Sequence, residues 1–246
     1  DYEPGFYSWS TKYLLADSTY KNDYPTIAIF NSMLLKEYFE NNHYHFAHSF
    51  AFDPVLNDGL RNALEKIPEQ VRKKKQILVY GRPGTERNAF NLVVAALKKW
   101  VFMQPDIEEW EILSAGEMHR TVALGNGKEL TSVGKLSIEE YANMLEESYA
   151  GISLMCSPHP SYPPLEMSVF DVKTITNTYA NKDLKDFNEN IISLDNISPM
   201  NIAKHLVEIC KSYQTEVRHI AANPLYVKND HVFDFVEDIK KILDEE

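Results

Sequence analysis

The segment Gly151–Leu184 contains the residues whose types and spacing point most directly to chemistry. Its pattern predicts a strand, a loop, a short helix, a second strand and the start of another helix. The apolar run Ile152–Met155 is typical of a strand buried on both faces, and the loop Ser157–Pro164 has four prolines, which cannot join a β-ladder. Because α/β sheets bind ligands at the carboxyl ends of their strands, we expect a ligand site at this loop.

Glu166 lies two residues after the end of this loop. Pro163 and Pro164 suit the first turn of the short helix, so Glu166 falls within that turn. The first N–H groups of a helix have no partner inside the helix, and we expect them to face the site and favour a phosphorylated ligand. A simpler interpretation stays open, because a carboxylate in a first turn stabilises its own helix by about 0.3–1 kcal/mol.

Two arginines stand between a predicted strand and a predicted helix. Arg82 and Arg87 lie in the phrase YGRPGTERN, so both can face a crevice at the start of that helix. The phrase lacks the second glycine and the Lys-Ser/Thr pair of a nucleotide-triphosphatase loop, and no Gly-x-Gly-x-x-Gly occurs, which counts against a nicotinamide or flavin cofactor. An arginine after a strand is also commonly a solvated loop residue.

Other polar side chains allow two interpretations each. His159 could donate a hydrogen bond to phosphate or sugar, and Tyr162 could pack on a base or an apolar sugar face, but both could equally pack on their neighbours. Asn177, Thr178 and Asn181 could contact ligand or cap a helix over 181–187, and for Asn181 we favour the cap. The alternation of His43, His45 and His48 suits the approach to a strand better than a metal site.

Composition restricts the class of protein. The chain has 246 residues with 44% hydrophobic content, enough for one large or two small domains. A net charge of −11 argues against nucleic-acid binding, and the basic run Arg72–Lys75 is interpreted as a solvated linker. Cys156 and Cys210 form no disulfide framework and are expected to be buried thiols in a reducing compartment. No apolar stretch approaches the roughly 20 residues of a membrane span, so any membrane contact would be peripheral.

The predicted elements form two series that divide near residues 68–76. Before the division, helices and strands are expected to alternate, as Leu14–Tyr20, Thr26–Phe30, Leu34–Glu40 and His48–Phe52. After it, a longer series is expected, as Ile77–Gly81, Asn88–Val101, Trp110–Ala115, Leu130–Val133, Ser137–Glu147, a helix opened by Ser198-Pro199, and His231–Leu243. Ser137 and Glu140 have the spacing of a capping box. Strands that alternate with helices predict an α/β fold with a parallel sheet.

Four phrases carry a resemblance to a known family. The phrases SPHPSYPPLEM and TNTYANKDL, with DYEPGFYSWSTKYLLADSTY at the start and FDP at Phe52–Pro54, resemble retaining GT-B glycosyltransferases. They are most similar to WsaF-type rhamnosyltransferases, which use dTDP-β-L-rhamnose. The resemblance implies a Rossmann-like parallel sheet with helices on both faces, preceded by the partial end of a second Rossmann-like domain.

The resemblance also implies a domain plan. Residues 1–70 would be the last part of the acceptor-side domain, 75–225 the donor-binding domain, and 229–246 a terminal helix that packs back on the first part. Because two complete Rossmann-like domains need about 100–200 residues each, we expect the chain to be cut from a longer polypeptide.

The resemblance assigns roles to residues. Arg82, Arg87 and Lys135 would contact the donor diphosphate, although Arg87 stands where the family often has lysine. Glu166 would accept hydrogen bonds from ribose or sugar hydroxyls. Broader retaining families have another glutamate eight residues earlier, where this sequence has Pro158. The acceptor side would include Asp1, Glu3 and Tyr7, three residues of the phrase at the start of the chain.

The implied activity is transfer of L-rhamnose from a dTDP-sugar donor to a polysaccharide or lipid-linked glycan acceptor, with retention of configuration. No two aspartates are two residues apart, so fixed cations in place of a metal cofactor are expected to stabilise the diphosphate. The expected location is the cytoplasm, at the inner face of the membrane. No catalytic base can be named. Two alternatives stay open: a catalytically incomplete nucleotide-sugar-binding or interaction module, and, less favoured, an epimerase of the same fold.

Overall fold

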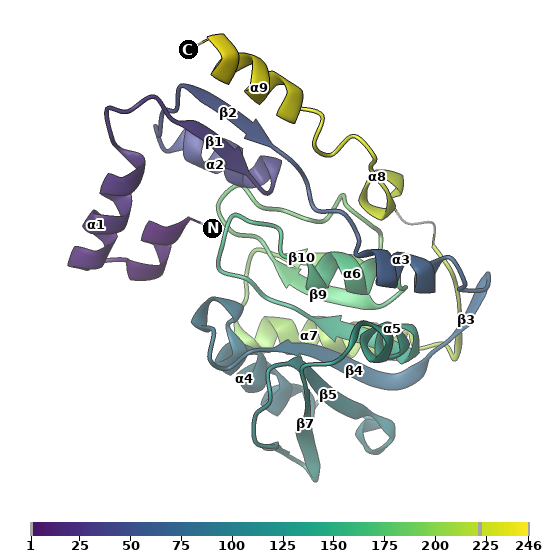
Figure 1. Cartoon of the computed structure of the whole chain (residues 1–246). Helices are drawn as coiled ribbons and strands as arrows, with labels where there is room; N and C mark the ends of the chain where they lie inside the picture. The colour runs from purple at the N-terminus through teal and green to yellow at the C-terminus, as the bar shows by residue number, and fades with distance from the viewer. Residues whose placement is uncertain (1, 221–222, 246) are drawn as a thin grey trace.

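A seven-stranded sheet forms the centre of the protein in a computed structural model, which describes residues 2–220 and 223–245 (Figure 1). From edge to edge its strands are β10 (Ile191–Leu194), β9 (Lys173–Asn177), β8 (Ser148–Ile152), β4 (Lys74–Gly81), β5 (Glu111–Gly116), β7 (Lys128–Gly134) and β6 (Val122–Gly125). All neighbours pair in parallel except β6 and β7, which are antiparallel. The predicted α/β class with a parallel sheet is confirmed.

The order of the strands creates a switch point beside β4. The chain moves from β4 to β5 and β7 on one side, then returns to β8 on the other side of β4. Loops that leave neighbouring strands in opposite directions open a crevice at the carboxyl ends of those strands. The sheet therefore provides a ligand crevice where β4 and β8 end.

Helices cover both faces of this sheet. On one face lie α4 (Phe90–Trp100) and α7 (Pro199–Lys211), and on the other lie α3 (Asp58–Leu64), α5 (Ile138–Glu147) and α6 (Pro163–Val169). Alternate residues of β4 serve the two faces, since Ile77 and Val79 pack in the α4–α7 core and Leu78 in the other. Burial of each such side chain contributes about 1.5–3 kcal/mol, which explains why β4 has a continuous apolar run.

The N-terminal portion has a separate small sheet. Strands β1 (Ile27–Phe30) and β2 (His48–Ala51) pair in parallel beside α2 (Met33–Asn41), preceded by η1 (Glu3–Tyr7) and α1 (Thr11–Tyr20). Its core of mainly aromatic side chains consists of Tyr2, Phe30, Leu35, Phe39 and Tyr44. The two sheets are distinct, and the functional division into acceptor and donor domains stays a prediction.

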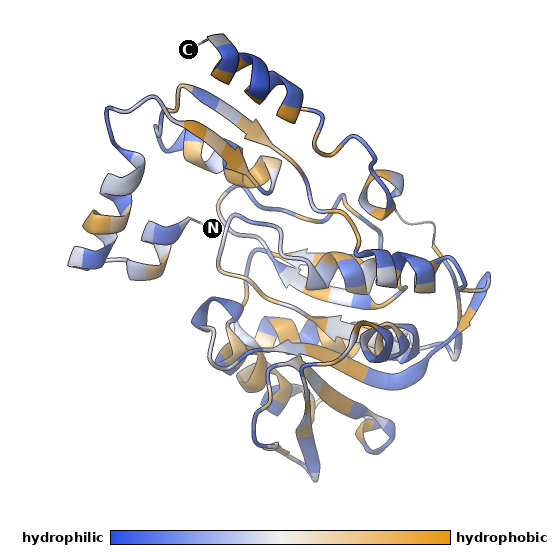
Figure 2. Cartoon of the chain, in the orientation of Figure 1, coloured by the Kyte–Doolittle hydropathy of each residue, from blue (hydrophilic) through white to orange (hydrophobic). Residues whose placement is uncertain are grey.

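The last part of the described chain runs beside the first. Strand β11 (Glu216–Arg218) pairs with β3 (Gln70–Arg72), and α8 (Pro224–Val227) and α9 (Val236–Glu245) follow. Just before α9, the Phe235 ring stacks on Phe50 at 5.5 Å between centroids. Figure 1 shows α9 alongside β2, and Figure 2 shows α9 as mostly hydrophilic, as expected of a surface helix. The helix begins five residues later than predicted.

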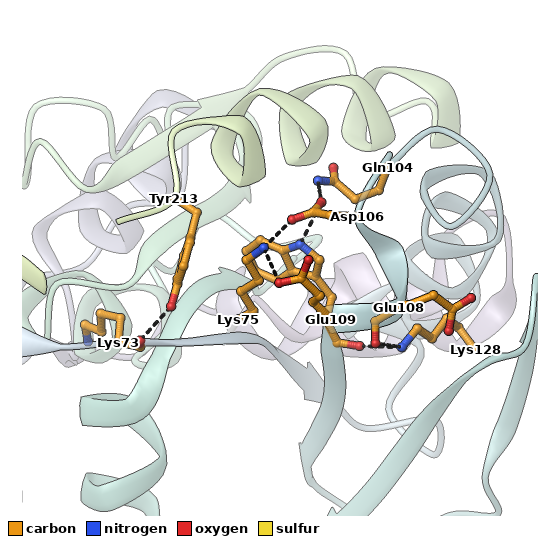
Figure 3. Close-up of polar contacts among 9 residues, drawn as sticks. Lys73, Lys75, Gln104, Asp106, Glu108, Glu109, Lys128 and Tyr213 are labelled. Carbon is orange, nitrogen blue, oxygen red and sulfur yellow. Dashed lines mark hydrogen bonds and ion pairs between the residues drawn. The ribbon is translucent and has the colours of Figure 1, made fainter. Parts of the chain in front are cut away.

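The basic run 72–75 is not a solvated linker, so that prediction is wrong. Lys73 is buried, and its Nζ donates to the carbonyl oxygens of Leu145 at 3.1 Å and Phe170 at 2.6 Å. Lys75 forms ion pairs with Asp106 and Glu109 (Figure 3). Lys73 thus satisfies carbonyls at the ends of α5 and α6, a role that depends on contacts remote in sequence.

The predicted helix over 181–187 is also absent from the structure. Tyr179 and Lys182 instead form an isolated antiparallel bridge, and the segment continues through turns. The Asn181 Nδ2 atom donates to the Leu34 carbonyl oxygen at 2.8 Å, so Asn181 ties the N-terminal portion to the sheet. Asn177 holds Met155 instead of capping a helix, accepting from its N–H at 2.8 Å and donating to its carbonyl at 3.2 Å.

The capping box of α5 is confirmed. The Ser137 Oγ atom accepts from the Glu140 N–H at 3.2 Å, and the Glu140 carboxylate accepts from the Ser137 N–H at 2.8 Å. Replacing Ser137 by alanine should lower the free energy of unfolding by about 1 kcal/mol, because one N–H at the helix start loses its acceptor. Urea denaturation checks this, and Ser137→Thr should retain most of the stability.

Candidate functional site

A cavity of about 660 Å³ lies at the carboxyl ends of the central strands. The last residues of β5 and the residues that follow β4, β7 and β8 line it, as the switch point predicts. The structure brings all six residues of the expected donor site to this one cavity, namely Arg82, Arg87, Lys135, His159, Tyr162 and Glu166. Whether they bind a donor stays a prediction.

The loop after β4 positions the two arginines. Gly81 ends the strand where a Cβ atom would lie 1.9 Å from Ser114 Oγ, so only glycine fits this approach to β5. The chain then turns through η2 (Glu86–Asn88), with the Thr85 N–H donating to the Arg82 carbonyl at 3.0 Å. The Arg87 carbonyl accepts from the Cys156 N–H at 2.8 Å, which ties this loop to the one after β8.

The charge of the cavity is opposite to that of the chain. Arg82, Arg87 and the exposed Lys135 line it, and among the described lining residues Glu166 is the only acidic one. The chain as a whole carries −11. Three cations gathered in one cavity of an acidic protein favour an anionic ligand, and guanidinium groups suit the oxygens of phosphate.

His159 is held as a neutral ring in the wall of the cavity. Its Nδ1 accepts from the Ser161 N–H at 3.0 Å, which leaves the proton on Nε2. Burial lowers the pKa of His159 to about 4, and the charges of Lys182 and Arg87 act in the same direction. The Nε2 atom makes no hydrogen bond of ordinary geometry to the described residues, although the Asn31 backbone is near enough to oppose part of this shift. His159 therefore offers an N–H donor without a positive charge.

Tyr162 completes the loop at the start of α6. It is 40% exposed, and its ring lies 5.7 Å from that of His159, in a tilted arrangement. Ser161, just before it, has a left-handed φ of 69°, which turns the chain sharply toward the helix. Both residues line the cavity, and their rings also pack on each other. Both interpretations of these residues therefore stay open.

The start of α6 offers fewer N–H groups than predicted. Pro163 and Pro164 occupy the first helical positions and have no N–H, and the Glu166 N–H donates to the Tyr162 carbonyl at 2.9 Å. Only Leu165 remains to provide a free N–H in this turn. The helix start therefore has fewer free N–H groups than expected, and whether it contacts a phosphate stays a prediction.

Burial determines the charge of Glu166. Its surface still reaches the cavity, but the surrounding protein raises the pKa of the carboxyl to about 7, and the nearby Tyr141 hydroxyl opposes part of the rise. A helix start alone would lower this pKa, so desolvation outweighs the helix dipole here. The buried Tyr141 hydroxyl forms no hydrogen bond of ordinary geometry with the described residues. Glu166 can therefore gain or lose a proton near neutral pH.

Several residues that line the cavity were not predicted from the sequence. Asn31 reaches the cavity from the N-terminal portion, and Tyr141 from α5. Gly116 has a φ of 125°, and a Cβ atom there would lie 3.1 Å from the Arg82 Cγ atom, so glycine leaves room for the Arg82 side chain. One feature of the sequence could have indicated Tyr141, because it follows the Ser137 cap by one helical turn.

Of the residues expected on the acceptor side, Glu3 and Tyr7 do not line this cavity. Asp1 lies outside the described residues. Glu3 and Tyr7 are both in η1, where the Tyr7 hydroxyl donates to the Glu3 carboxylate at 2.8 Å. They face the surface near α1, and their role stays a prediction.

Two kinds of feature are absent from the described residues, 2–220 and 223–245. No helix in this part is long and apolar enough to cross a membrane. No group of three or more His, Cys, Asp or Glu side chains there could hold a metal ion, and this includes His43, His45 and His48. That the site works without a metal stays a prediction.

Comparison with known proteins gives matches in both portions of the chain. The model of the WsaF C-terminal domain matches residues 75–207, and that of the WsaF N-terminal domain matches residues 1–33. The O-antigen biosynthesis protein RfbC of Myxococcus xanthus is 34% identical over 178 residues. This alignment covers 72% of the chain but only 13% of the length of that protein.

Solved structures share the fold at low identity. Sucrose-phosphate synthase from Thermosynechococcus elongatus matches with a TM-score of 0.59 and 12% identity. The match covers all of this chain and 67% of the synthase chain. WaaG, a glycosyltransferase involved in lipopolysaccharide biosynthesis, has a TM-score of 0.59 and 11% identity, covering 84% of this chain and 60% of its own. These likenesses confirm the expected GT-B-type architecture.

Proposed function

Because the chain belongs to the WsaF family, we propose that it is the donor-binding part of a glycosyltransferase that builds a cell-surface polysaccharide. One observation carries the proposal: three cationic side chains and one carboxylate line a single cavity at the switch point of a GT-B-type sheet. A nucleotide-sugar matches this cavity, since its diphosphate suits the cations and its hydroxyls suit the carboxylate.

The proposed reaction requires stabilisation of the negative charge on the leaving diphosphate. As the bond between the sugar's anomeric carbon and the phosphate oxygen breaks, negative charge grows on that oxygen. Arg82 and Arg87 would donate to the diphosphate, and Lys135 would add a third charge. Charge-assisted hydrogen bonds contribute about 1.5–3 kcal/mol each, which is the stabilisation that a metal would otherwise provide. His159 would add a neutral donor, and Glu166 would accept from a ribose or sugar hydroxyl.

The donor we propose is dTDP-β-L-rhamnose, with retention of configuration and without a metal cofactor. The family resemblance supports this donor, as does the partly exposed ring of Tyr162 in the cavity wall, which would suit a sugar that has a methyl group. We assign no enzymic nucleophile. The acceptor oxygen would bond to the anomeric carbon while the bond to phosphate breaks, and the acceptor's proton would pass to an oxygen of the leaving diphosphate.

The proposed acceptor is a growing polysaccharide or lipid-linked glycan. The printed name of the relative from Myxococcus xanthus, an O-antigen biosynthesis protein, supports this class of product. A reaction between a nucleotide-sugar and such a glycan would take place in the cytoplasm, at the inner face of the membrane. The chain would reach the membrane only peripherally.

Calorimetric titration of the chain with dTDP, UDP and GDP tests the donor assignment. We expect dTDP to bind most tightly in the presence of EDTA, with no more than a twofold change when magnesium replaces EDTA, because protein cations hold the diphosphate. Preference for UDP or GDP would contradict the rhamnosyl donor. Absence of binding to all three would contradict the site itself. Binding of dTDP without sugar transfer to any glycan would favour the catalytically incomplete module.

A further inference from the structure

Arg87 lies between two cavities. Besides the 660 Å³ cavity, it lines a second one of about 440 Å³ between η1 and the loop after β4. The second cavity is also lined by Phe6, Thr85, Cys156 and Tyr179. The guanidinium carbon Cζ of Arg87 lies 4.9 Å from the centroid of the Phe6 ring. A residue of the N-terminal segment thus contacts a cation of the candidate donor site.

This contact is compatible with phosphate binding. A guanidinium group contacts an aromatic ring with the flat face of the guanidinium. Its hydrogen bonds are donated from the edges of the guanidinium, in the guanidinium plane. The Phe6 ring can therefore hold the group in place while its N–H bonds point at a diphosphate. The backbone of Arg87 is fixed by the Cys156 N–H, but that bond leaves the long side chain to be positioned by other contacts.

Phe6 is itself fixed to the N-terminal core. Tyr2, four residues earlier, is buried there, and its ring meets the Tyr38 ring at 5.0 Å and the Phe39 ring at 5.4 Å. The hydroxyls of Tyr2 and Tyr44 lie 2.9 Å apart. The Gly5 N–H donates to the Tyr2 carbonyl at 3.1 Å, so η1 is tied to this core immediately before Phe6. The backbone that carries the Phe6 ring is therefore linked to the N-terminal core.

We propose that Phe6 is a positioning residue that holds the Arg87 guanidinium toward the donor diphosphate, so that donor affinity depends on how the N-terminal core sits on the sheet. The proposal rests on the proposed function for its ligand, but the contact itself does not. Donor binding would then be strongest when the acceptor-side portion is docked on the sheet. When that portion is not docked, the protein would bind less donor and would hydrolyse less of it.

A ligand-free measurement tests the contact. Cys156 lines the small cavity and is partly exposed, whereas Cys210 is buried, so the rate of alkylation of the native protein reports on Cys156. Phe6→Leu and Arg87→Ala should each raise this rate about threefold or more, because either change loosens η1. The double variant should be no faster than the faster single variant. Phe6→Tyr should behave as wild type, and so should Trp9→Leu, which alters an exposed aromatic residue of the same segment.

A binding measurement tests the function of the contact. Phe6→Leu should weaken dTDP binding about threefold to tenfold, and in the Arg87→Ala background it should change the affinity less than twofold. Thymidine, which lacks the diphosphate, should bind the wild type and Phe6→Leu equally. Melting temperatures close to wild type would exclude misfolding.

The outcomes separate the two proposals. Additive effects of Phe6→Leu and Arg87→Ala, or wild-type behaviour of Phe6→Leu in both measurements, would overturn the positioning role. If the wild type binds no nucleotide while alkylation shows non-additive effects, the contact stands and the proposed function fails.

Discussion

Replacing Arg82 by alanine is expected to weaken dTDP binding by about 10- to 150-fold, the effect of losing charge-assisted hydrogen bonds worth about 1.5–3 kcal/mol. Arg82 directly follows the central strand β4 and lines the cavity, with Gly116 leaving room for its side chain. Arg82→Lys should give an intermediate affinity, because it keeps the charge but loses the planar arrangement of donors. Calorimetry in EDTA measures both values.

Arg120→Ala is the matched control for this prediction. Arg120 is an exposed arginine between β5 and β6 that does not line the cavity, so its loss should leave the affinity within twofold of wild type. An equal loss in both variants would indicate a general effect of net charge. Wild-type affinity in both Arg82→Ala and Glu166→Ala would show that the cavity is not the nucleotide site.

The sequence could predict part of the cavity because one rule of sheet geometry connects the segments that line it. Arg82 and Lys135 each follow a strand, and the carboxyl ends of parallel strands meet at one edge of the sheet. The short helix at Pro163 also follows from sequence, since proline suits the first helical position. Local signals and one topological rule were enough to bring most of these segments together, whereas Lys135 was assigned to the site only by the family resemblance.

Other features depend on contacts that no local pattern reveals. The run 72–75 reads as a hydrophilic linker, yet Lys73 is buried because the ends of α5 and α6 present carbonyls to it. Asn181 resembles a helix cap, but it bonds to the Leu34 carbonyl, which is remote in sequence. Asn31 and Tyr141 reach the cavity from segments that were assigned no site role. In each case the partner comes from tertiary packing, which overrides local preference.

Glu166 shows the same conflict in its chemistry. From sequence, a carboxylate in a first helical turn is expected to be ionised and stabilised by the helix. In the structure, surrounding protein raises its pKa to about 7. The residue was placed correctly, but its protonation could be judged only from the packing around α6, and this gives the site a dependence on pH.

The affinity of the wild type for dTDP should therefore increase as the pH rises from 6 to 8. The ionised carboxylate accepts a hydrogen bond from the deoxyribose hydroxyl of dTDP at either oxygen, and the neutral carboxyl formed at low pH is a weaker acceptor. One pH unit below a pKa of about 7, roughly a tenth of the carboxyl is ionised, so binding should be weaker at pH 6 than at pH 8, by up to about tenfold. Glu166→Gln cannot titrate and is the matched control, so any slope it shares with the wild type belongs to the nucleotide.

The free protein should show the opposite trend in stability, which separates burial of Glu166 from ligand binding. Its pKa in the folded state, about 7, lies above the ordinary value of 4.5, so the folded state binds more protons between these two values. The contribution of Glu166 to stability is complete below pH 4.5 and is lost as the pH rises through 7. At about 1.4 kcal/mol per pKa unit, the free energy of unfolding of the wild type should fall relative to Glu166→Gln by about 3 kcal/mol across this range. Urea denaturation at pH 5, 6, 7 and 8 measures this difference. A constant difference would show that the carboxylate is well solvated, and pH-dependent dTDP binding would then need another titrating group.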